Sequence, residues 1–423
     1  MKEKFLHFLW RYRRFDVLNI CTTENQRVDI LDTGEYNTHS GPDFLHARLK
    51  IGDMLWIGNV EMHLRASEWI AHGHHEDKAY NNVILHVVYE EDAVIQRMDG
   101  TRIPCLVIKN YLRENLSGIY EQLQQNTLWI PCRNQLQNVS EICKNSWWQR
   151  MLIERMEQKT ERIGEDLQRN NRNWEETFYL HLARSFGLSN NELPFEMLAR
   201  TLPLSIISRH RDRPLQLEAL YFGQSGLLDD VILLDEYPKQ LKKEYLHLKR
   251  KYGLQPLQKS TWKFLRMRPL GFPTLRIAQF AAFMGETTNL FATFMEATEV
   301  EEIEGLLQRE INTYWDSHYV FDKSSSVQKK QLGKDSVRRI IINTVCPFIF
   351  AFGRDKNNPM YQETAFDLLE QLEPEANAVI DKWRVLGINV KSAAESQALL
   401  YQKKYYCDLK RCLECGIGNF LLR

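Results

Sequence analysis

The chain has 423 residues, of which 43% are hydrophobic and 26% are charged, with 55 basic and 55 acidic residues. This is the composition of an ordinary soluble protein, and the length exceeds that of one typical core, so we expect two or three domains. No apolar run approaches the ~20 residues that a membrane span requires, and zero net charge excludes a chain that is basic throughout.

The first 15 residues, MKEKFLHFLWRYRRF, combine basic and apolar side chains. They lack the long apolar centre and the small-residue cleavage site of a signal peptide. We therefore expect a short amphipathic helix at the start of a cytoplasmic protein that makes no contact with a membrane.

The next hundred or so residues have the patterns of β-strands. Residues 44–51 alternate between apolar and polar side chains, whereas residues 54–64 are more apolar, as in a strand covered on both faces. We expect five strands, in RVDILDTG (27–34), FLHARLKI (44–51), MLWIGNVEMHL (54–64), NNVILHVVYE (81–90) and RIPCLVIK (102–109). This predicts a mixed-sheet domain over residues 1–135.

After residue 140 the pattern becomes helical. Apolar residues recur at helical spacing and are interrupted by Gly and Pro, in residues 142–168, 174–188, 214–228, 273–286 and 337–353. Glu-Pro-Glu near residue 374 is expected to open another helix, and KSSSVQKK (323–330) to form a surface loop. The predicted fold class is α+β, with a mainly α-helical region over residues 136–423.

Three ionisable residues lie near one end of a predicted hairpin. Asp43 opens one strand, and Glu61 and His63 close the next. A two-residue loop at Gly52-Asp53 places Asp43 opposite Met62, whereas a longer loop or a bulge places Asp43 opposite Glu61. Charged groups in a packed sheet are costly unless they are paired or hold an ion.

Pro42-Asp43 and Glu61-Met62-His63 resemble the motif of the PD-(D/E)XK phosphodiesterase superfamily, with His63 in the position of the lysine. The resemblance implies a nuclease-like domain in which Asp43 and Glu61 bind Mg²⁺ or Mn²⁺ and His63 is the third catalytic residue. A metal-bound water would attack the phosphodiester. Nucleic acid is then the expected partner.

Two other functions remain open. Eight of the twelve histidines fall within the first 86 residues. A zinc-dependent hydrolase would use His63, His72, His74 or His75 with Asp77. A non-catalytic nucleic-acid-binding or scaffold protein would retain a degenerate site.

Residues 239–276 are strongly basic, with eleven Lys or Arg and one acidic residue. Within this stretch aromatic residues alternate with cations, and cations neutralise phosphates while aromatic rings stack on bases. A solvated helix face followed by a turn with aromatic core residues gives the same pattern. The residues expected to bind nucleic acid are Trp262, Lys263, Arg266, Arg268 and Arg276.

The C-terminal end is rich in cysteine. Cys407, Cys412 and Cys415 form C-x₄-C-x₂-C, and Cys346 is the candidate for a fourth thiolate. Four thiolates suit tetrahedral zinc or an iron–sulfur cluster, and reduced buried thiols are the alternative. The pattern resembles the helicase-associated PD-(D/E)XK nucleases, although their nuclease core lies between the cysteine ligands and here all four follow it.

The chain as a whole resembles an uncharacterised bacterial family defined only as a domain of unknown function. The segments GPDF, GNVEMH, LHVVY, RPLGFPTLR and the cysteine-rich tail carry this resemblance over nearly the whole length. It implies no activity, but it suggests that the two ends of the chain belong to one working unit.

Overall fold

The computed structural model describes residues 2–112, 116–229 and 232–423. The chain divides into two compact units, Met1–Trp148 with Tyr401–Arg423, and Gln149–Leu400. The sequence placed the boundary at residue 135 and assigned the tail to the helical region. In the structure the tail returns to the first unit, so this unit is built from both ends of the chain.

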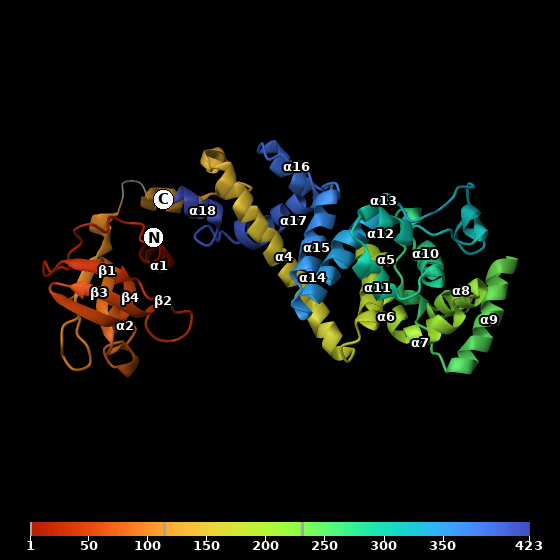
Figure 1. Cartoon of the computed structure of the whole chain (residues 1–423), viewed down its shortest axis with the longest axis horizontal. Helices are drawn as coiled ribbons and strands as arrows, with labels where there is room; N and C mark the ends of the chain where they lie inside the picture. Colours follow the sequence, from red (N-terminus) through yellow and green to blue (C-terminus); the bar gives the residue numbers. More distant parts are fainter. Residues whose placement is uncertain (1, 113–115, 230–231) are drawn as a thin grey trace. The chain divides into compact units, whose positions relative to one another are not determined.

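A mixed sheet forms the centre of the first unit (Figure 1). Its strand order is β1-β3-β4-β5-β6, with the short strand β2 also paired to β3. The β1-β3 and β3-β4 pairs are antiparallel, and the β4-β5 and β5-β6 pairs are parallel. The strands are β1 (Val28–Asp32), β2 (Glu35–Tyr36), β3 (Phe44–Ile51), β4 (Met54–Arg65), β5 (Val83–Glu90) and β6 (Cys105–Val107). The expected mixed fold with a sheet near the N-terminus is confirmed.

Burial along β4 differs from the expectation that it is covered on both faces. The strand is mostly buried from Gly58 to His63, but Met54–Ile57 are exposed. The parallel partner β5 pairs with β4 only from Asn59 onward. The first residues of β4 therefore extend beyond β5, which explains why their apolar side chains reach solvent.

Helix α1 (Glu3–Arg11) covers the sheet with one face, as its amphipathic pattern predicts. Phe5, Leu6, Leu9 and Trp10 are fully buried, and α1 packs against β4. The other helices assigned to this unit are α2 (Glu68–Ala71), α3 (Leu116–Gln125) and α18 (Gly416–Leu421), with short turns η1 (Lys78–Tyr80), η2 (Ile108–Tyr111), η3 (Arg133–Asn138) and η9 (Lys403–Cys407).

The second unit is almost entirely helical (Figure 1). Its helices are α4 (Glu141–Arg169, which begins in the first unit), α5 (Trp174–Phe186), α6 (Leu188–Thr201), α7 (Leu204–Ile207), α8 (Pro214–Gln224), α9 (Glu236–Tyr252), α10 (Pro273–Glu286), α11 (Leu290–Glu296), α12 (Val300–Leu307), α13 (Lys334–Ile340), α14 (Cys346–Asp355), α15 (Pro359–Gln371), α16 (Ala378–Val385) and α17 (Ala393–Gln402, which ends in the first unit). A small hairpin, β7 (His318–Val320) and β8 (Lys323–Ser324), completes it.

Aromatic packing forms much of the core of the second unit. The ring of Phe178 lies 5.2 Å from that of Phe294, and the ring of Phe283 lies 6.1 Å from Phe294. The continuous helical stretch Lys334–Asp355 is long and apolar enough to cross a membrane, but 72% of its most apolar window is buried within the protein. Its apolar character is that of a core helix.

Two local expectations in this unit need correction. The helix expected near residue 374 begins at Ala378, because the side chain of Asn377 caps it by accepting from the N–H groups of Val379 and Ile380. In the predicted surface loop 323–330, Lys330 is buried, and its ammonium donates to the carbonyl oxygen of Trp315 at 2.7 Å.

Candidate metal centre

The β3-β4 hairpin begins with the two-residue loop that the sequence suggests. Ile51 pairs with Met54, and this register continues along most of the hairpin. If it continued to the end, Asp43 and Glu61 would lie on opposite faces of the sheet, because side chains alternate along a strand.

A bulge prevents this outcome. His46 adopts a φ of 57°, in the left-handed region that few residues other than glycine adopt. Beyond the bulge the register has shifted by one, so that Phe44 pairs with Val60. Extending this register by one residue sets Asp43 opposite Glu61, which is the second of the two predicted registers.

Reciprocal hydrogen bonds join the ends of the two strands. The N–H of Asp43 donates to Oε2 of Glu61 at 3.0 Å, and the N–H of Met62 donates to Oδ2 of Asp43 at 3.0 Å. Each carboxylate therefore accepts from the backbone of the opposite strand. This arrangement holds both side chains in fixed positions and leaves Oε1 of Glu61 available to other groups.

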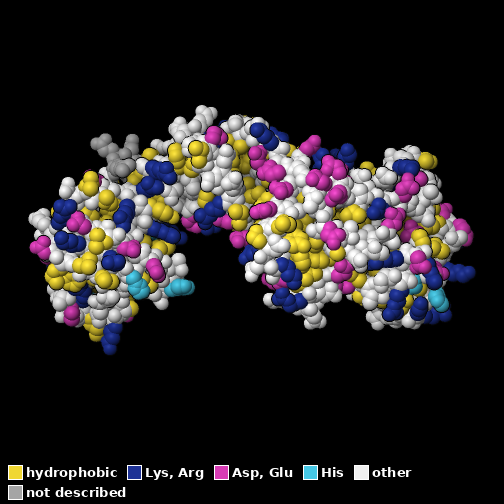
Figure 2. Space-filling model, viewed as in Figure 1, with side chains coloured by type: hydrophobic (Ala, Val, Ile, Leu, Met, Phe, Trp, Pro, Cys, Tyr) yellow, Lys and Arg dark blue, Asp and Glu magenta, His cyan; other side chains and the backbone are white. Residues whose placement is uncertain are grey.

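Imidazole rings surround Oε1 of Glu61. This oxygen lies 3.3 Å from Nε2 of His74 and 3.7 Å from Nε2 of His63. Nε2 of His63 lies 3.2 Å from Nδ1 of His72, while its Nδ1 lies 2.8 Å from Nε2 of His86. One nitrogen from each of His63, His72 and His74 lies within 4.8 Å of the other two. Figure 2 shows histidine side chains, in cyan, gathered on one part of the surface of the first unit.

Helix α2 and the turn after it supply two of these rings. Trp69 is fully buried in the core beside Tyr80 and anchors the short helix. Gly73 has a φ of 75°, which lets the chain turn back after His72, and the N–H of His74 then donates to the carbonyl of Trp69 at 3.1 Å. The ring of His74 stacks on Tyr80 with centroids 3.8 Å apart.

The charges of the central groups are set mainly by burial. Burial raises the pKa of Glu61 to about 7, against the opposing effect of its hydrogen bond to His74. Burial lowers the pKa of His63 to about 3, and the nearby His74 lowers it further. His63 is therefore neutral at physiological pH, as an imidazole must be in order to bind a metal.

A second cluster, Glu3, His7 and Asp43, adjoins the first. Nε2 of His7 lies 3.2 Å from Oδ2 of Asp43 and 3.4 Å from Oε1 of Glu3, and its Nδ1 lies 3.3 Å from the hydroxyl of Tyr36. Burial lowers the pKa of His7, but its contacts with Asp43 and Glu3 outweigh burial and raise the pKa to about 9. His7 is thus a cation between two carboxylates.

The sequence identified only part of this arrangement. Asp43, Glu61 and His63 lie together, with His72 and His74. His75 instead pairs with Glu76 at 3.5 Å, and Asp77 caps the turn η1 by accepting from the N–H of Ala79.

His7, Glu3 and His86 were not predicted as site residues. The concentration of histidines before residue 87 was the only signal for His7 and His86, since packing brings them to the hairpin from a different helix and strand.

Two residues of the predicted nucleic-acid surface are buried. The indole N–H of Trp262 donates to the carbonyl of Ser225 at 2.8 Å, and the side chain is 5% exposed. Arg276 is 6% exposed and donates to the hydroxyl of Ser336 at 2.8 Å. Both side chains are buried inside the helical unit. They are therefore not part of the predicted binding surface.

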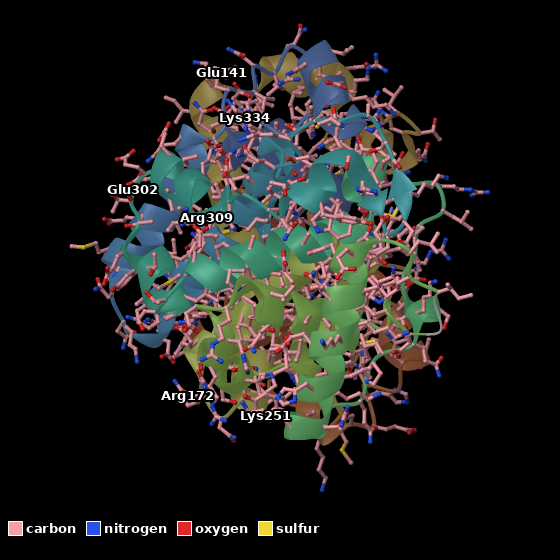
Figure 3. The ribbon with its side chains drawn as sticks, turned by 90° about the vertical axis from the view of Figure 1, so that its right-hand side faces the viewer. Glu141, Arg172, Lys251, Glu302, Arg309 and Lys334 are labelled. Carbon is pink, nitrogen blue, oxygen red and sulfur yellow. The ribbon has the colours of Figure 1, made fainter. Side chains whose placement is uncertain are left out.

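The remaining residues of that prediction are accessible. Lys263, Arg266 and Arg268 are exposed in the second unit. Upstream of them, α9 carries further exposed cations, and Lys251 lies at its end, as Figure 3 shows. The exposed side chains of this stretch are therefore cations, and the predicted tryptophan is not among them.

The cysteine group differs from the predicted set. Cys346 is fully buried at the start of α14 in the second unit, whereas Cys407, Cys412 and Cys415 belong to the first unit. A small cavity in the first unit is lined by these three residues and by Cys132. The fourth cysteine that lines this cavity is Cys132, and Cys346 does not line it.

Comparison with known proteins identifies a family but no activity. No curated protein and no solved structure matches the chain. The family described as protein of unknown function (DUF2851) matches residues 3–378, which confirms the expected resemblance to a domain of unknown function. The chain belongs to this family.

Proposed function

We propose that the first unit is a metal-dependent phosphodiesterase whose ion is held by the imidazoles of His63, His72 and His74. The observation that carries the proposal is the approach of one nitrogen from each ring to within 4.8 Å of the others. Imidazole nitrogen suits zinc and similar transition ions, whereas Mg²⁺ takes oxygen ligands. The ligand set therefore favours zinc over the Mg²⁺ or Mn²⁺ expected from Asp43 and Glu61.

The arrangement leaves room for chemistry at the ion. Catalytic zinc sites keep three protein ligands and an open position, and the bound ion lowers the pKa of a water and stabilises negative charge. His72 is exposed, so the ligand set is open to solvent on that side. Glu61, whose Oε1 lies close to two of the ligands, is placed to accept the proton of the attacking water.

The other groups hold this arrangement and supply charge. Asp43 fixes Glu61 through the backbone hydrogen bonds between their strands. His63 stands where the resembled motif has lysine, but it is buried beside His86 and serves as a ligand. His7 is a nearby cation, but it lies between the carboxylates of Asp43 and Glu3. The bound ion itself would supply the positive charge that stabilises an anionic substrate such as a phosphodiester.

Phosphodiester as the substrate class rests on two features together. Asp43 and Glu61 lie opposite each other on adjacent strands, as the resemblance to PD-(D/E)XK enzymes requires, and the proposed ion would lie beside them. Nucleic acid is the natural polymeric form of this substrate. The exposed cations Lys263, Arg266 and Arg268 in the second unit are candidates for binding its backbone.

A zinc-dependent hydrolase acting on other esters or amides is the second candidate. The three imidazoles favour it as much as they favour a phosphodiesterase, because this ligand set does not by itself select the substrate. The substrate range of the enzyme decides between the two.

The test uses the full chain, stripped of metal and reloaded with zinc, manganese or magnesium. Substrates are bis(p-nitrophenyl) phosphate, single-stranded and duplex DNA, RNA, and p-nitrophenyl acetate as a carboxylic ester. We expect zinc-dependent cleavage of the phosphodiesters that His74→Gln removes. His75→Gln is the matched control, because the neighbouring His75 lies outside the ligand set.

Each outcome has a distinct meaning. Cleavage of the carboxylic ester alone would establish the second candidate. Nucleic-acid binding with no metal-dependent cleavage of any substrate would identify a non-catalytic binding protein. Equal loss of activity in His74→Gln and His75→Gln would exclude the proposed ligand set.

A further inference from the structure

The cavity in the first unit is separate from the histidine cluster, and both ends of the chain contribute to it. Cys132 precedes the turn η3, while Cys407, Cys412 and Cys415 lie in the C-terminal tail. All four line the cavity, together with Arg411 and Gly418. All four are buried, with 7% to 9% of each residue exposed.

We propose that Cys132, Cys407, Cys412 and Cys415 form a tetrathiolate metal centre, which takes either one zinc ion or an iron–sulfur cluster. Four cysteines around one cavity make the ligand set that both centres use. The proposal is independent of the function proposed for the histidine cluster.

The proximity of the thiols is also visible in their electrostatics. Burial raises the pKa of Cys407, and the neighbouring thiols of Cys415, Cys132 and Cys412 raise it further. Burial likewise raises the pKa of Cys412 to about 12, with Cys415 as the next cause. These interactions are in keeping with the four thiols lying around one cavity.

Groups that favour thiolates already surround the cavity. The backbone N–H groups of Ile417 and Gly418, in the first turn of α18, lower the pKa of Cys415 against the effect of burial. Lys403 acts in the same direction on Cys407, and Lys410 on Cys412. Backbone N–H dipoles and nearby cations of this kind offset the negative charge of a centre with four thiolate ligands.

The backbone is shaped to bring the tail around the cavity. A Cβ at Gly418 would lie 2.1 Å from the carbonyl oxygen of Cys412, and a Cβ at Gly416 would lie 2.7 Å from the ring of Trp147. The side-chain amide of Gln124 in α3 donates to the carbonyl of Lys410 at 3.1 Å. Figure 1 shows the result, with α18 beside the beginning of α4.

The spacing of the sulfur atoms bears on which centre is present. Tetrahedral zinc with Zn–S bonds of ~2.3 Å places its sulfurs about 3.8 Å apart. Within the described parts of the chain, no three cysteine sulfurs lie within 4.8 Å of one another. A cluster distributes its thiolates over separate iron atoms, so the wider spacing favours iron–sulfur over a single zinc ion.

The test is metal and acid-labile sulfide analysis of the full chain purified anaerobically, together with its visible absorption. Iron with sulfide and a coloured protein identifies the cluster, and one zinc per chain in a colourless protein identifies the zinc form. Cys132→Ser should lose most of the metal. Cys21→Ser and Cys346→Ser are the matched controls and should keep it, because neither residue lines the cavity.

Metal-free wild-type protein, or a full complement of metal in Cys132→Ser, would overturn the proposal. If Cys132→Ser does not fold, X-ray absorption at the metal edge of the wild type replaces it. Sulfur coordination from four cysteines supports the centre, and a first shell dominated by nitrogen or oxygen excludes it. Because imidazoles hold the other proposed ion, His74→Gln should keep this metal even if the proposed function fails.

Discussion

The backbone N–H of Asp43 donates to the carboxylate of Glu61 at 3.0 Å across the β3-β4 pair. This contact exists because the bulge at His46 shifts the register by one residue. One oxygen of Glu61 is thereby held by the sheet, and the other lies among imidazoles. The bulge thus connects the strand ends to the three-histidine ligand set.

Glu61→Gln should separate metal binding from catalysis. The amide preserves the shape of the side chain but cannot accept a proton, so we expect cleavage to fall by ~10²- to 10⁴-fold. Zinc should still raise the melting temperature of the variant, because the imidazoles remain. Loss of the zinc-induced shift in a thermal melt would instead make Glu61 a ligand, as the sequence predicted.

His86→Gln should weaken metal binding without removing a ligand. A ligating histidine usually donates its other N–H to a partner, and Nδ1 of His63 lies 2.8 Å from Nε2 of His86. We expect zinc affinity, measured by calorimetry, to fall by about 10- to 100-fold. His75→Gln is the control, because His75 pairs with Glu76 and lies outside the ligand set. An unchanged zinc affinity in His86→Gln would show that His86 does not support metal binding by His63.

His7 should make the metal-free protein less stable at alkaline pH. The carboxylates of Glu3 and Asp43 and the hydroxyl of Tyr36 face its ring. Its pKa of about 9 in the folded protein lies above the usual histidine pKa of 6.5. The stabilisation is therefore complete below pH 6.5 and is lost as pH rises through 9.

The measurement is denaturant unfolding of metal-free protein between pH 6 and pH 9.5. Relative to His7→Gln, the wild type should lose roughly 3 kcal/mol across this range at most. Parallel pH profiles for the two proteins would show that His7 is not held as a cation in the fold.

The exposed cations after α9 should govern nucleic-acid binding, whereas the buried residues should not. Arg266→Gln with Arg268→Gln should reduce the salt slope of duplex DNA binding by up to about 2, since each phosphate contact contributes ~0.9. Trp262→Phe should leave that slope unchanged and lower stability by about 1 kcal/mol, because its hydrogen bond to Ser225 is lost. A normal slope in the arginine variant would place binding elsewhere.

Local patterns predicted the elements well. The expected strand 44–51 and the expected helix 273–286 match β3 and α10 residue for residue, because periodicity and turn residues are local properties. The bulge at His46 was not predictable, since it depends on a positive φ at a residue other than glycine. The sequence analysis included the bulge only as the cause of one of the two possible registers of the hairpin.

Long-range packing accounts for the other differences. The whole of the second unit separates Cys132 from Cys407 in the sequence, so the place of Cys132 in the cysteine group depends on the return of the tail. The residues next to Trp262 in the sequence do not show whether its side chain is exposed or buried. Its burial depends on tertiary packing, which brings the carbonyl oxygen of Ser225 to its indole N–H. Residues brought together by tertiary contacts leave no periodic signal.

The most direct test of the histidine site is anomalous diffraction from crystals of the full chain grown with zinc, with data collected on both sides of the zinc absorption edge. We expect a peak about 2.0–2.1 Å from one nitrogen of each of His63, His72 and His74, adjacent to the carboxylate of Glu61. Zinc bound elsewhere in the first unit, with these three rings free of metal, would contradict it.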